Sequence, residues 1–193
     1  MSDDFVYYAT VEERAEFRHL TAGLPETEIG LSAHSLFAVK AIVATVKPKR
    51  VLEIGFDRGS SSAMWLGLSD ASVVSIDISD DPELHRAVAV LQNRYPGRLE
   101  FIRSDSTKVE IDPRLHQFDM AFIDGDHTED GALSDLMMVK SLNIQWVVLD
   151  DWLEDFGPGV AIAAERAGFE PFAIFKRNIA LGRFVLSRHH ELA

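Results

Sequence analysis

Short apolar runs alternate along the chain with longer stretches in which apolar residues recur every three or four positions. The short runs are typical of buried strands, and the longer stretches predict amphipathic helices. The predicted strands cover 50–54, 72–76, 99–103, 118–123 and 145–149. The predicted helices cover 32–46, 60–68, 82–94, 128–141 and 158–167, and a further helix precedes them.

Several residues mark where these helices begin and end. Thr10 and Glu13 have the spacing of a capping box, which predicts the start of the first helix. Pro82 occupies a first helical position, where its missing N–H costs nothing. Pro48 follows one helix as a stop signal, and Gly168 follows the last helix as an end signal.

The alternation of strands and helices predicts βαβ units, a mostly parallel sheet and right-handed crossovers. Two further strand-like runs, 171–175 and 179–186, lie too close together for a helical crossover. We therefore expect them to form an antiparallel hairpin at one side of the sheet. The predicted fold is a doubly wound α/β domain with a seven-stranded sheet. It spans 1–193, with N-terminal helices in 1–48 and the core in 49–193.

Composition narrows the classes of function. A chain of 193 residues fits one domain. It has no cysteine, which excludes disulfides, thiolate metal sites and a cysteine nucleophile. A net charge of −12 opposes binding to nucleic acid. The N-terminus lacks a signal-peptide pattern and no apolar run is long enough to span a bilayer, so we expect a cytoplasmic protein without a membrane partner.

The first strand is followed by a glycine turn that contains Gly55 and Gly59. Asp57 stands where a dinucleotide-binding turn has its middle glycine, and a carboxylate there would repel a diphosphate. Asp77 ends the second strand 22 residues after Gly55, a position suited to hydrogen bonds with a ribose diol. The other interpretation of this segment is a plain strand-to-helix turn capped by serines.

Carboxylates follow every one of the five parallel strands. Those after the third, fourth and fifth strands are Asp105, Asp124, Asp126, Asp150 and Asp151. Because the carboxyl ends of parallel strands meet at one edge, we expect these side chains to converge there. Like charges brought together need an opposite charge, so the pattern favours a cationic cofactor such as a sulfonium, or a hard divalent metal ion.

Five segments resemble, in order, the motifs of class I S-adenosylmethionine-dependent methyltransferases. They are 51–61, 75–78, 101–106, 118–127 and 147–152. Within that superfamily the sequence is most similar to the small catechol- and caffeoyl-CoA-type O-methyltransferases and their bacterial relatives, from about Ile29 to Leu186. The resemblance implies S-adenosylmethionine as cofactor, a small-molecule acceptor and a homodimer.

The resemblance also implies roles for individual residues. Gly55 and Gly59 would pass beneath the methionine part of the cofactor, Ser61 would bind its carboxylate, and Glu53 would help to shape that pocket. Asp77 would bind the ribose hydroxyls of the cofactor. Its adenine would contact Ile78, Asp105 and Ser106, and Asp124 would also lie beside the cofactor.

In metal-dependent members of this group, an aspartate after the fourth strand and an acidic pair after the fifth hold Mg²⁺ or another divalent cation. The matching residues here are Asp124, Asp150 and Asp151. The metal would bind two substrate oxygens and lower the pKa of a hydroxyl. His127 stands where some members have a lysine base, and together with Asp124 it is the catalytic candidate. It could equally be a helix-start residue that hydrogen-bonds locally.

Two other functions remain open on the sequence. One is a metal-independent methyltransferase, in which the Asp150–Asp151 pair caps the next segment or orients the substrate. The other is a non-catalytic cofactor-binding protein. A dehydrogenase is the least supported class because of Asp57. The acceptor is not identified: Gly125 and Asp126 differ from the bulkier residues expected in a catechol pocket.

Overall fold

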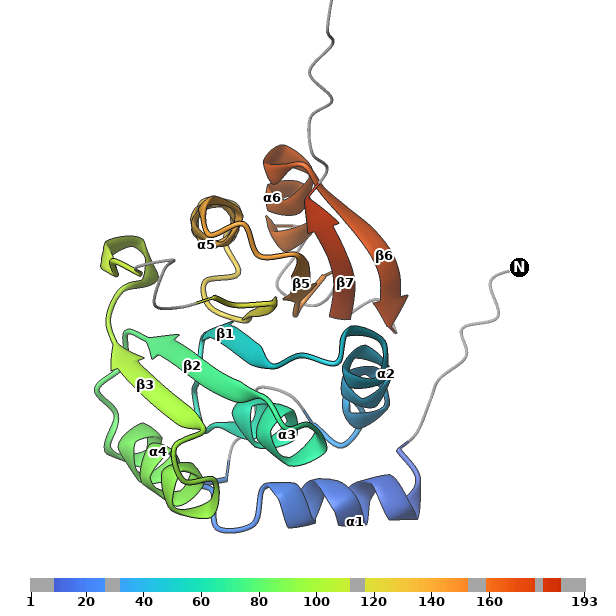
Figure 1. The fold of residues 1–193 in the computed structure, drawn as a ribbon, viewed down its shortest axis with the longest axis vertical. Helices are drawn as coiled ribbons and strands as arrows, with labels where there is room; N and C mark the ends of the chain where they lie inside the picture. The colour runs from blue at the N-terminus through green and yellow to red at the C-terminus, as the bar shows by residue number, and fades with distance from the viewer. Residues whose placement is uncertain (1–8, 27–31, 112–116, 153–158, 176–178, 185–193) are drawn as a thin grey trace, which may run out of the picture.

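A computed structural model describes residues 9–26, 32–111, 117–152, 159–175 and 179–184 of the chain. These residues form a seven-stranded sheet flanked by helices (Figure 1). The strands are β1 (Arg50–Ile54), β2 (Ser72–Asp77), β3 (Leu99–Arg103), β4 (Met120–Ile123), β5 (Trp146–Leu149), β6 (Phe169–Phe175) and β7 (Ile179–Phe184). The helices are α1 (Val11–Leu20), α2 (Leu36–Val46), α3 (Ser60–Leu68), α4 (Pro82–Arg94), α5 (Glu129–Ser141) and α6 (Gly159–Ala167), with a 3₁₀ turn η1 (Ser106–Lys108).

The strands lie in the order β3-β2-β1-β4-β5-β7-β6. The first five are parallel, with Leu52 opposite both Val74 and Ala121. β7 runs antiparallel to β5 and to β6, which confirms the predicted hairpin. The order reverses between β1 and β4, and an open parallel sheet binds its ligands outside the strand ends at such a point.

Helices cover both faces of the sheet, because successive strand residues point to opposite sides. Val51 of β1 belongs to a core formed with α1, α2, α3 and α4, whereas Leu52 belongs to a second core formed with α5 and α6. Figure 1 shows the same two layers, with α5 and α6 on the opposite side of the sheet from α3.

The helix ends agree closely with the sequence. Thr10 Oγ1 accepts a hydrogen bond from the Glu13 amide and the Glu13 carboxylate accepts one from the Thr10 amide, so the capping box is confirmed. Pro82 opens α4, with Asp81 as its cap. In the described part of the chain, no helix has both the length and the apolar character needed to cross a membrane.

Three predicted boundaries are wrong by at least two residues, and one of them is the start of β4, which lies at Met120 rather than at 118. The helix predicted over 32–46 begins only at Leu36, because the hydroxyls of Ser32 and Ser35 bond to nearby backbone amides and hold 33–35 in turns. β6 begins at Phe169 rather than at 171, directly after Gly168. The predicted helix start at 158 and strand end at 185–186 lie outside the described residues.

Candidate functional site

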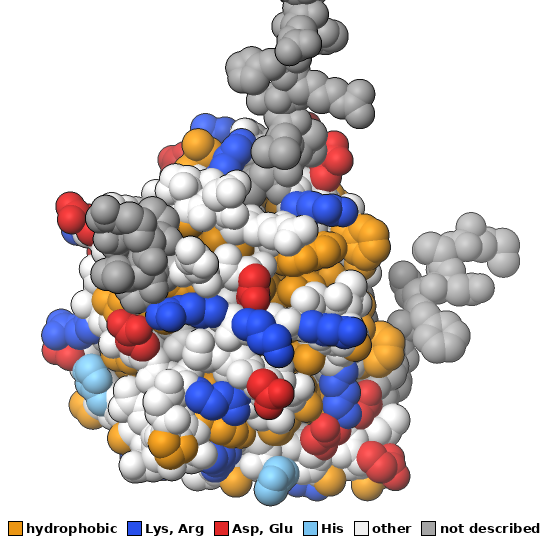
Figure 2. Space-filling view, in the orientation of Figure 1, with side chains coloured by type: hydrophobic (Ala, Val, Ile, Leu, Met, Phe, Trp, Pro, Cys, Tyr) orange, Lys and Arg blue, Asp and Glu red, His pale blue; other side chains and the backbone are white. Residues whose placement is uncertain are grey.

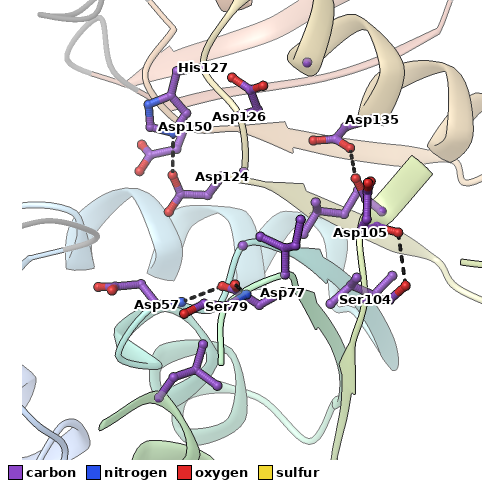
Figure 3. Close-up of a pocket in the computed structure, with 18 of the residues that line it drawn as sticks. Asp57, Asp77, Ser79, Ser104, Asp105, Asp124, Asp126, His127, Asp135 and Asp150 are labelled. Carbon is purple, nitrogen blue, oxygen red and sulfur yellow. Dashed lines mark hydrogen bonds and ion pairs between the residues drawn. The ribbon is translucent and has the colours of Figure 1, made fainter. Parts of the chain in front are cut away.

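A cleft of about 950 Å³ lies at the carboxyl ends of the parallel strands (Figure 3). Its walls come from the segments that follow β1 to β5, as the sequence predicted. Gly55, Asp77, Ile78, Asp105, Ser106, Asp124, His127, Asp150 and Asp151 all line it. Of the predicted site residues, Glu53, Gly59 and Ser61 are not part of the lining.

Backbone hydrogen bonds continue past the strand ends and fix the cleft residues side by side. The Gly55 amide donates to Ile76 O at 2.9 Å, and the Asp124 amide donates to Ile54 O at 2.8 Å. The Asp150 amide likewise donates to the carbonyl of Ile123 at 3.1 Å. The sheet therefore determines which strand-end residues are neighbours, and the loops add little to that choice.

Gly55 is required where β1 passes the end of β4. Its φ is +91°, and a Cβ at this position would lie 1.9 Å from the Asp124 carbonyl oxygen. Both facts exclude a side chain. The close approach brings the β1 turn against the backbone that carries Asp124, so the two halves of the cleft share one rigid floor.

Asp77 holds the turn after β1 in place. Its Oδ2 accepts hydrogen bonds from the amides of Phe56 at 2.8 Å and Asp57 at 3.1 Å, and its Oδ1 accepts one from Ser79 at 2.8 Å (Figure 3). Oδ2 thus uses both of its lone pairs, whereas Oδ1 keeps a second lone pair for a ligand. Asp77 can therefore order the glycine turn and accept a hydrogen bond from a diol through Oδ1 at the same time.

Glu53 lies beneath the cleft and is completely buried. Its carboxylate accepts hydrogen bonds from Ser61 at 2.7 Å, Ser62 at 2.5 Å and Ser75 at 2.6 Å. Burial raises the pKa of Glu53 to about 7 despite these bonds. The Ser61 hydroxyl thus points to Glu53 in this structure. The cofactor roles of both residues remain predictions.

The end of the cleft beside β3 is built around two aspartates. Asp105 accepts bonds from the Thr107 amide and hydroxyl and from the Lys108 ammonium. These bonds lower the pKa of Asp105 to about 2, and the bond from Lys108 has the largest effect. Ser106 Oγ donates to Asp135 Oδ1 at 2.5 Å.

Asp135 was not among the predicted site residues. It lies on α5, on the face that carries the buried residues Ala132, Leu136 and Val139, and only 3% of its surface is exposed. Burial raises the pKa of Asp135 to about 6. A carboxylate within the apolar stripe of a helix was the sequence signal that could have identified it.

The other end of the cleft contains His127 between two carboxylates. Its Nδ1 lies 2.9 Å from Asp151 Oδ2, and its Nε2 lies 3.4 Å from Asp124 Oδ1 (Figure 3). The hydrogen bonds with Asp124 and Asp151 raise the pKa of His127 to about 10. At neutral pH the imidazole is therefore protonated and balances part of the acidic charge.

Asp150 is the third carboxylate at this end. It is buried, and its Oδ1 has no hydrogen-bond partner among the described residues. Burial first, and then the charges of Asp124 and Asp151, raise the pKa of Asp150 to about 8. A buried oxygen without a partner costs free energy, which a cation or a donor from a ligand would recover.

The residues that could hold a metal differ in part from the predicted set of Asp124, Asp150 and Asp151. Ligand atoms of Asp124, His127 and Asp151 lie within 4.8 Å of one another. Two carboxylates and an imidazole suit a divalent cation, and the unpartnered Asp150 oxygen adds a fourth donor atom at the same acidic end. The donor set therefore fits a divalent metal ion, with His127 as an additional candidate ligand.

The charge of the chain is concentrated in this cleft. Nine aspartates line it, and the cationic side chains in its described lining are Arg58 and His127. Arg58 is already paired with Asp81 at 2.8 Å. By contrast, Figure 2 shows a face of the molecule on which Lys and Arg side chains are interspersed with Asp and Glu. The cleft therefore favours a cationic ligand.

Comparisons with solved structures identify the fold. A Burkholderia thailandensis 1,6-didemethyltoxoflavin-N1-methyltransferase, with its ligand and S-adenosylhomocysteine bound, matches at a TM-score of 0.61 and 19% identity over 79% of each chain. An S-adenosylhomocysteine-bound Podospora anserina methyltransferase matches at 0.60 and 18% identity, over 94% of this chain and 89% of that one. A Staphylococcus aureus protein named as a candidate caffeoyl-CoA O-methyltransferase matches at a TM-score of 0.61 and 16% identity, over 92% of this chain and 93% of that one.

These identities are low, so the structural matches show the shared fold. No curated protein matches the sequence. A family model described as a methyltransferase domain matches residues 52–152, which is more than half of the chain and contains all five strand ends of the cleft. The chain therefore belongs to the methyltransferase-domain family and has the class I S-adenosylmethionine-dependent methyltransferase fold.

Proposed function

We propose that this protein transfers the methyl group of S-adenosylmethionine to an oxygen of a small-molecule acceptor at the acidic end of the cleft. The observation that carries the proposal is the shared cleft. The Gly55 turn and Asp77 lie at one part of it, and Asp124, His127 and Asp151 lie at another. In the reaction the C–S bond breaks as the C–O bond forms, S-adenosylhomocysteine leaves, and the acceptor hydroxyl loses its proton.

The cofactor would lie along the strand ends. Asp77 would accept hydrogen bonds from its ribose hydroxyls, and Ile78, which is 69% exposed, would cover the base. Asp124 adjoins Gly55 and would place negative charge near the sulfonium. Holding the acceptor oxygen in line with the methyl group would supply much of the rate, because proximity replaces a bimolecular encounter.

A divalent cation would be held by Asp124, Asp151 and either His127 or Asp150. Bound there, it would polarise an acceptor hydroxyl and lower its pKa. The protonation state of His127 depends on whether such a cation is bound. While the imidazole alone balances the two carboxylates it is protonated at neutral pH, and it cannot accept a proton from the acceptor. With the carboxylates engaged by a cation, His127 would be neutral near pH 7 and able to act as the base.

A second candidate is metal-independent methyl transfer, and the paired state of His127 favours it. The protonated imidazole already supplies a positive charge between Asp124 and Asp151. In that case His127 would orient the acceptor or stabilise its developing oxyanion, and the proton would leave to water. The two candidates predict opposite responses to removal of divalent cations.

The first experiment is a calorimetric titration of the protein with S-adenosylmethionine and S-adenosylhomocysteine. We expect dissociation constants of about 1 to 100 μM, equivalent to about −8 to −5 kcal/mol. Initial rates of S-adenosylhomocysteine formation would then be measured over a panel of phenols, enols and N–H acceptors, with Mg²⁺, Mn²⁺ or excess EDTA. The absence of cofactor binding by a folded protein would refute the proposal.

Asp151→Asn separates the two candidates, with Asp70→Asn as the matched control. Asp70 is exposed and precedes β2, at the edge of the sheet opposite the cleft. If a cation assists the reaction, we expect Asp151→Asn to lower the metal-stimulated rate about 10- to 100-fold. Cofactor binding should stay largely intact. A wild-type rate that is unchanged in EDTA would instead support the metal-independent candidate.

A further inference from the structure

The acidic end of the cleft carries more negative charge than the cations of its lining balance. His127 lies between Asp124 and Asp151, with ring nitrogens 3.4 Å and 2.9 Å from their carboxylates. Arg58, the other cationic side chain in the described lining, is also engaged in an ion pair. Neither cation is therefore available to balance a further carboxylate at this end.

Asp150 is the first of two carboxylates that a ligand could still engage there. It follows β5, lines the cleft and has only 6% of its surface exposed. Its Oδ1 is buried and has no hydrogen-bond partner among the residues that the structure describes. The set of atoms close enough to share a metal comes from Asp124, His127 and Asp151, and it leaves this oxygen out. A ligand that brings a hydrogen-bond donor would be stabilised at Asp150.

Asp126 is the second of these carboxylates. It is exposed, lines the same cleft and lies beside His127 (Figure 3). Its Oδ1 accepts a hydrogen bond from the Thr128 amide at 2.9 Å. Its Oδ2 lies against α5, where a Cβ on Gly131 would be only 2.3 Å away. These two contacts hold the charge of Asp126 at the cleft, and no cation of the described residues forms an ion pair with it.

We infer that the methyl acceptor carries, besides its hydroxyl, a protonated amino group that donates a hydrogen bond to Asp150 Oδ1 and is attracted by Asp126. The inference rests on the proposed function, because it names the chemical class of the same acceptor. A primary ammonium supplies both the positive charge and the donors that this end of the cleft lacks. An acceptor with a carboxylate or phosphates, such as a coenzyme A thioester, would add negative charge to an acidic cleft.

The test is calorimetry on the protein saturated with S-adenosylhomocysteine, in EDTA near pH 7, with phenols that differ mainly in the charge of one end group. The probes are tyramine, an ammonium; tyrosol, which is neutral; and 4-hydroxyphenylacetate, a carboxylate. We expect tyramine to bind about 10- to 100-fold more tightly than tyrosol, and the carboxylate to bind most weakly. N,N,N-trimethyltyramine keeps the charge but has no N–H, so it should bind about 10-fold more weakly than tyramine.

Three variants locate the contact. In Asp150→Asn, tyramine should bind within a few-fold of tyrosol, because a neutral amide attracts an ammonium less strongly than a carboxylate does. Asp126→Asn should weaken tyramine binding only about 2- to 5-fold, since that side chain is exposed. Asp130→Asn is the matched control. It removes the same charge from a side chain that is 97% exposed and outside the described lining, and it should leave every affinity unchanged.

Wild-type protein that binds tyramine no more tightly than tyrosol would overturn the inference. A full preference for tyramine in Asp150→Asn, or equal binding of tyramine and its trimethyl analogue, would overturn it as well. Binding of no probe by protein that does bind S-adenosylhomocysteine would also overturn it and would leave the proposed function intact, whereas failure to bind S-adenosylhomocysteine would refute the proposed function itself. If Asp150→Asn does not fold, the comparison of tyramine with its trimethyl analogue on the wild type decides.

Discussion

Replacing Glu53 by glutamine tests how the buried floor of the cleft is stabilised. Three serine hydroxyls, from Ser61, Ser62 and Ser75, donate to the carboxylate, and none of its surface is exposed. Hydrogen bonds to the ionised form lower a pKa, whereas burial raises it. Here burial is the larger effect, so the pKa of Glu53 rises from 4.5 to about 7.

The sign and size of the effect follow from proton linkage. A carboxyl whose pKa is higher in the folded than in the unfolded state binds its proton more tightly when folded. The stability it contributes is complete below pH 4.5 and is lost as the pH rises through about 7. The gap between the two pKa values corresponds to about 3 kcal/mol of unfolding free energy for Glu53 alone.

The assay is urea denaturation of wild type and Glu53→Gln at intervals from pH 4 to pH 9, with the difference in unfolding free energy plotted against pH. Subtraction removes the titration of every group that the two proteins share. We expect the variant to gain about 3 kcal/mol relative to wild type between pH 4.5 and pH 8. Glu165→Gln, at an exposed site on α6, is the control for removal of a surface carboxylate, and the change for Glu53→Gln should exceed it. A flat difference for Glu53→Gln would show that the serine bonds fully offset burial, and would refute the reasoning.

Three further predictions concern stability. Gly55→Ala should lower the unfolding free energy by about 3 kcal/mol or more in urea, and Gly97→Ala by only about 1 kcal/mol. Both positions have positive φ, but a Cβ meets backbone at 1.9 Å only at Gly55, and has nothing within 4 Å at Gly97, so equal losses would contradict the argument. Thr10→Ala removes the side-chain cap of α1 and should cost about 1 kcal/mol by the same method; no loss would mean that α1 does not depend on its cap. Asp150→Asn should be more stable than wild type above pH 8 in EDTA, because the raised pKa of Asp150 means that its stability contribution is lost as the pH passes about 8; a lower melting temperature at pH 9 would contradict this.

Most of the fold could be predicted from the sequence, because the apolar residues recur at regular spacing and capping residues mark the ends of the helices. The bounds of β1, α3 and β3 match the predicted ranges residue for residue. The error at α2 has a local cause, since Ser32 and Ser35 offer backbone amides an alternative to the helix. Apolar spacing records which residues face the core, and it does not record this competition.

The candidate site could be predicted only in part. Residues that follow parallel strands must meet at one edge, so the positions of Asp77, Asp124 and Asp150 in the cleft followed from the strand assignment. The direction of a side chain within a strand depends on pairing. Glu53 lies opposite Ser75 in the β1–β2 register, and the two point to the same face, away from the cleft. That register is not visible in the spacing of the motifs.

The same limit explains why Asp135 and the pairing of His127 emerged only from the structure. Both depend on contacts between α5 or its preceding loop and strand ends far away in the sequence.

The acidic lining of the cleft favours the methyl donor over the product of the reaction. The substrate form of the cofactor carries a positive sulfonium, and the product form is neutral at sulfur. A cleft lined by nine aspartates, whose two cations are already paired, attracts the first more strongly than the second. The acidic lining would therefore promote both binding of the methyl donor and release of S-adenosylhomocysteine.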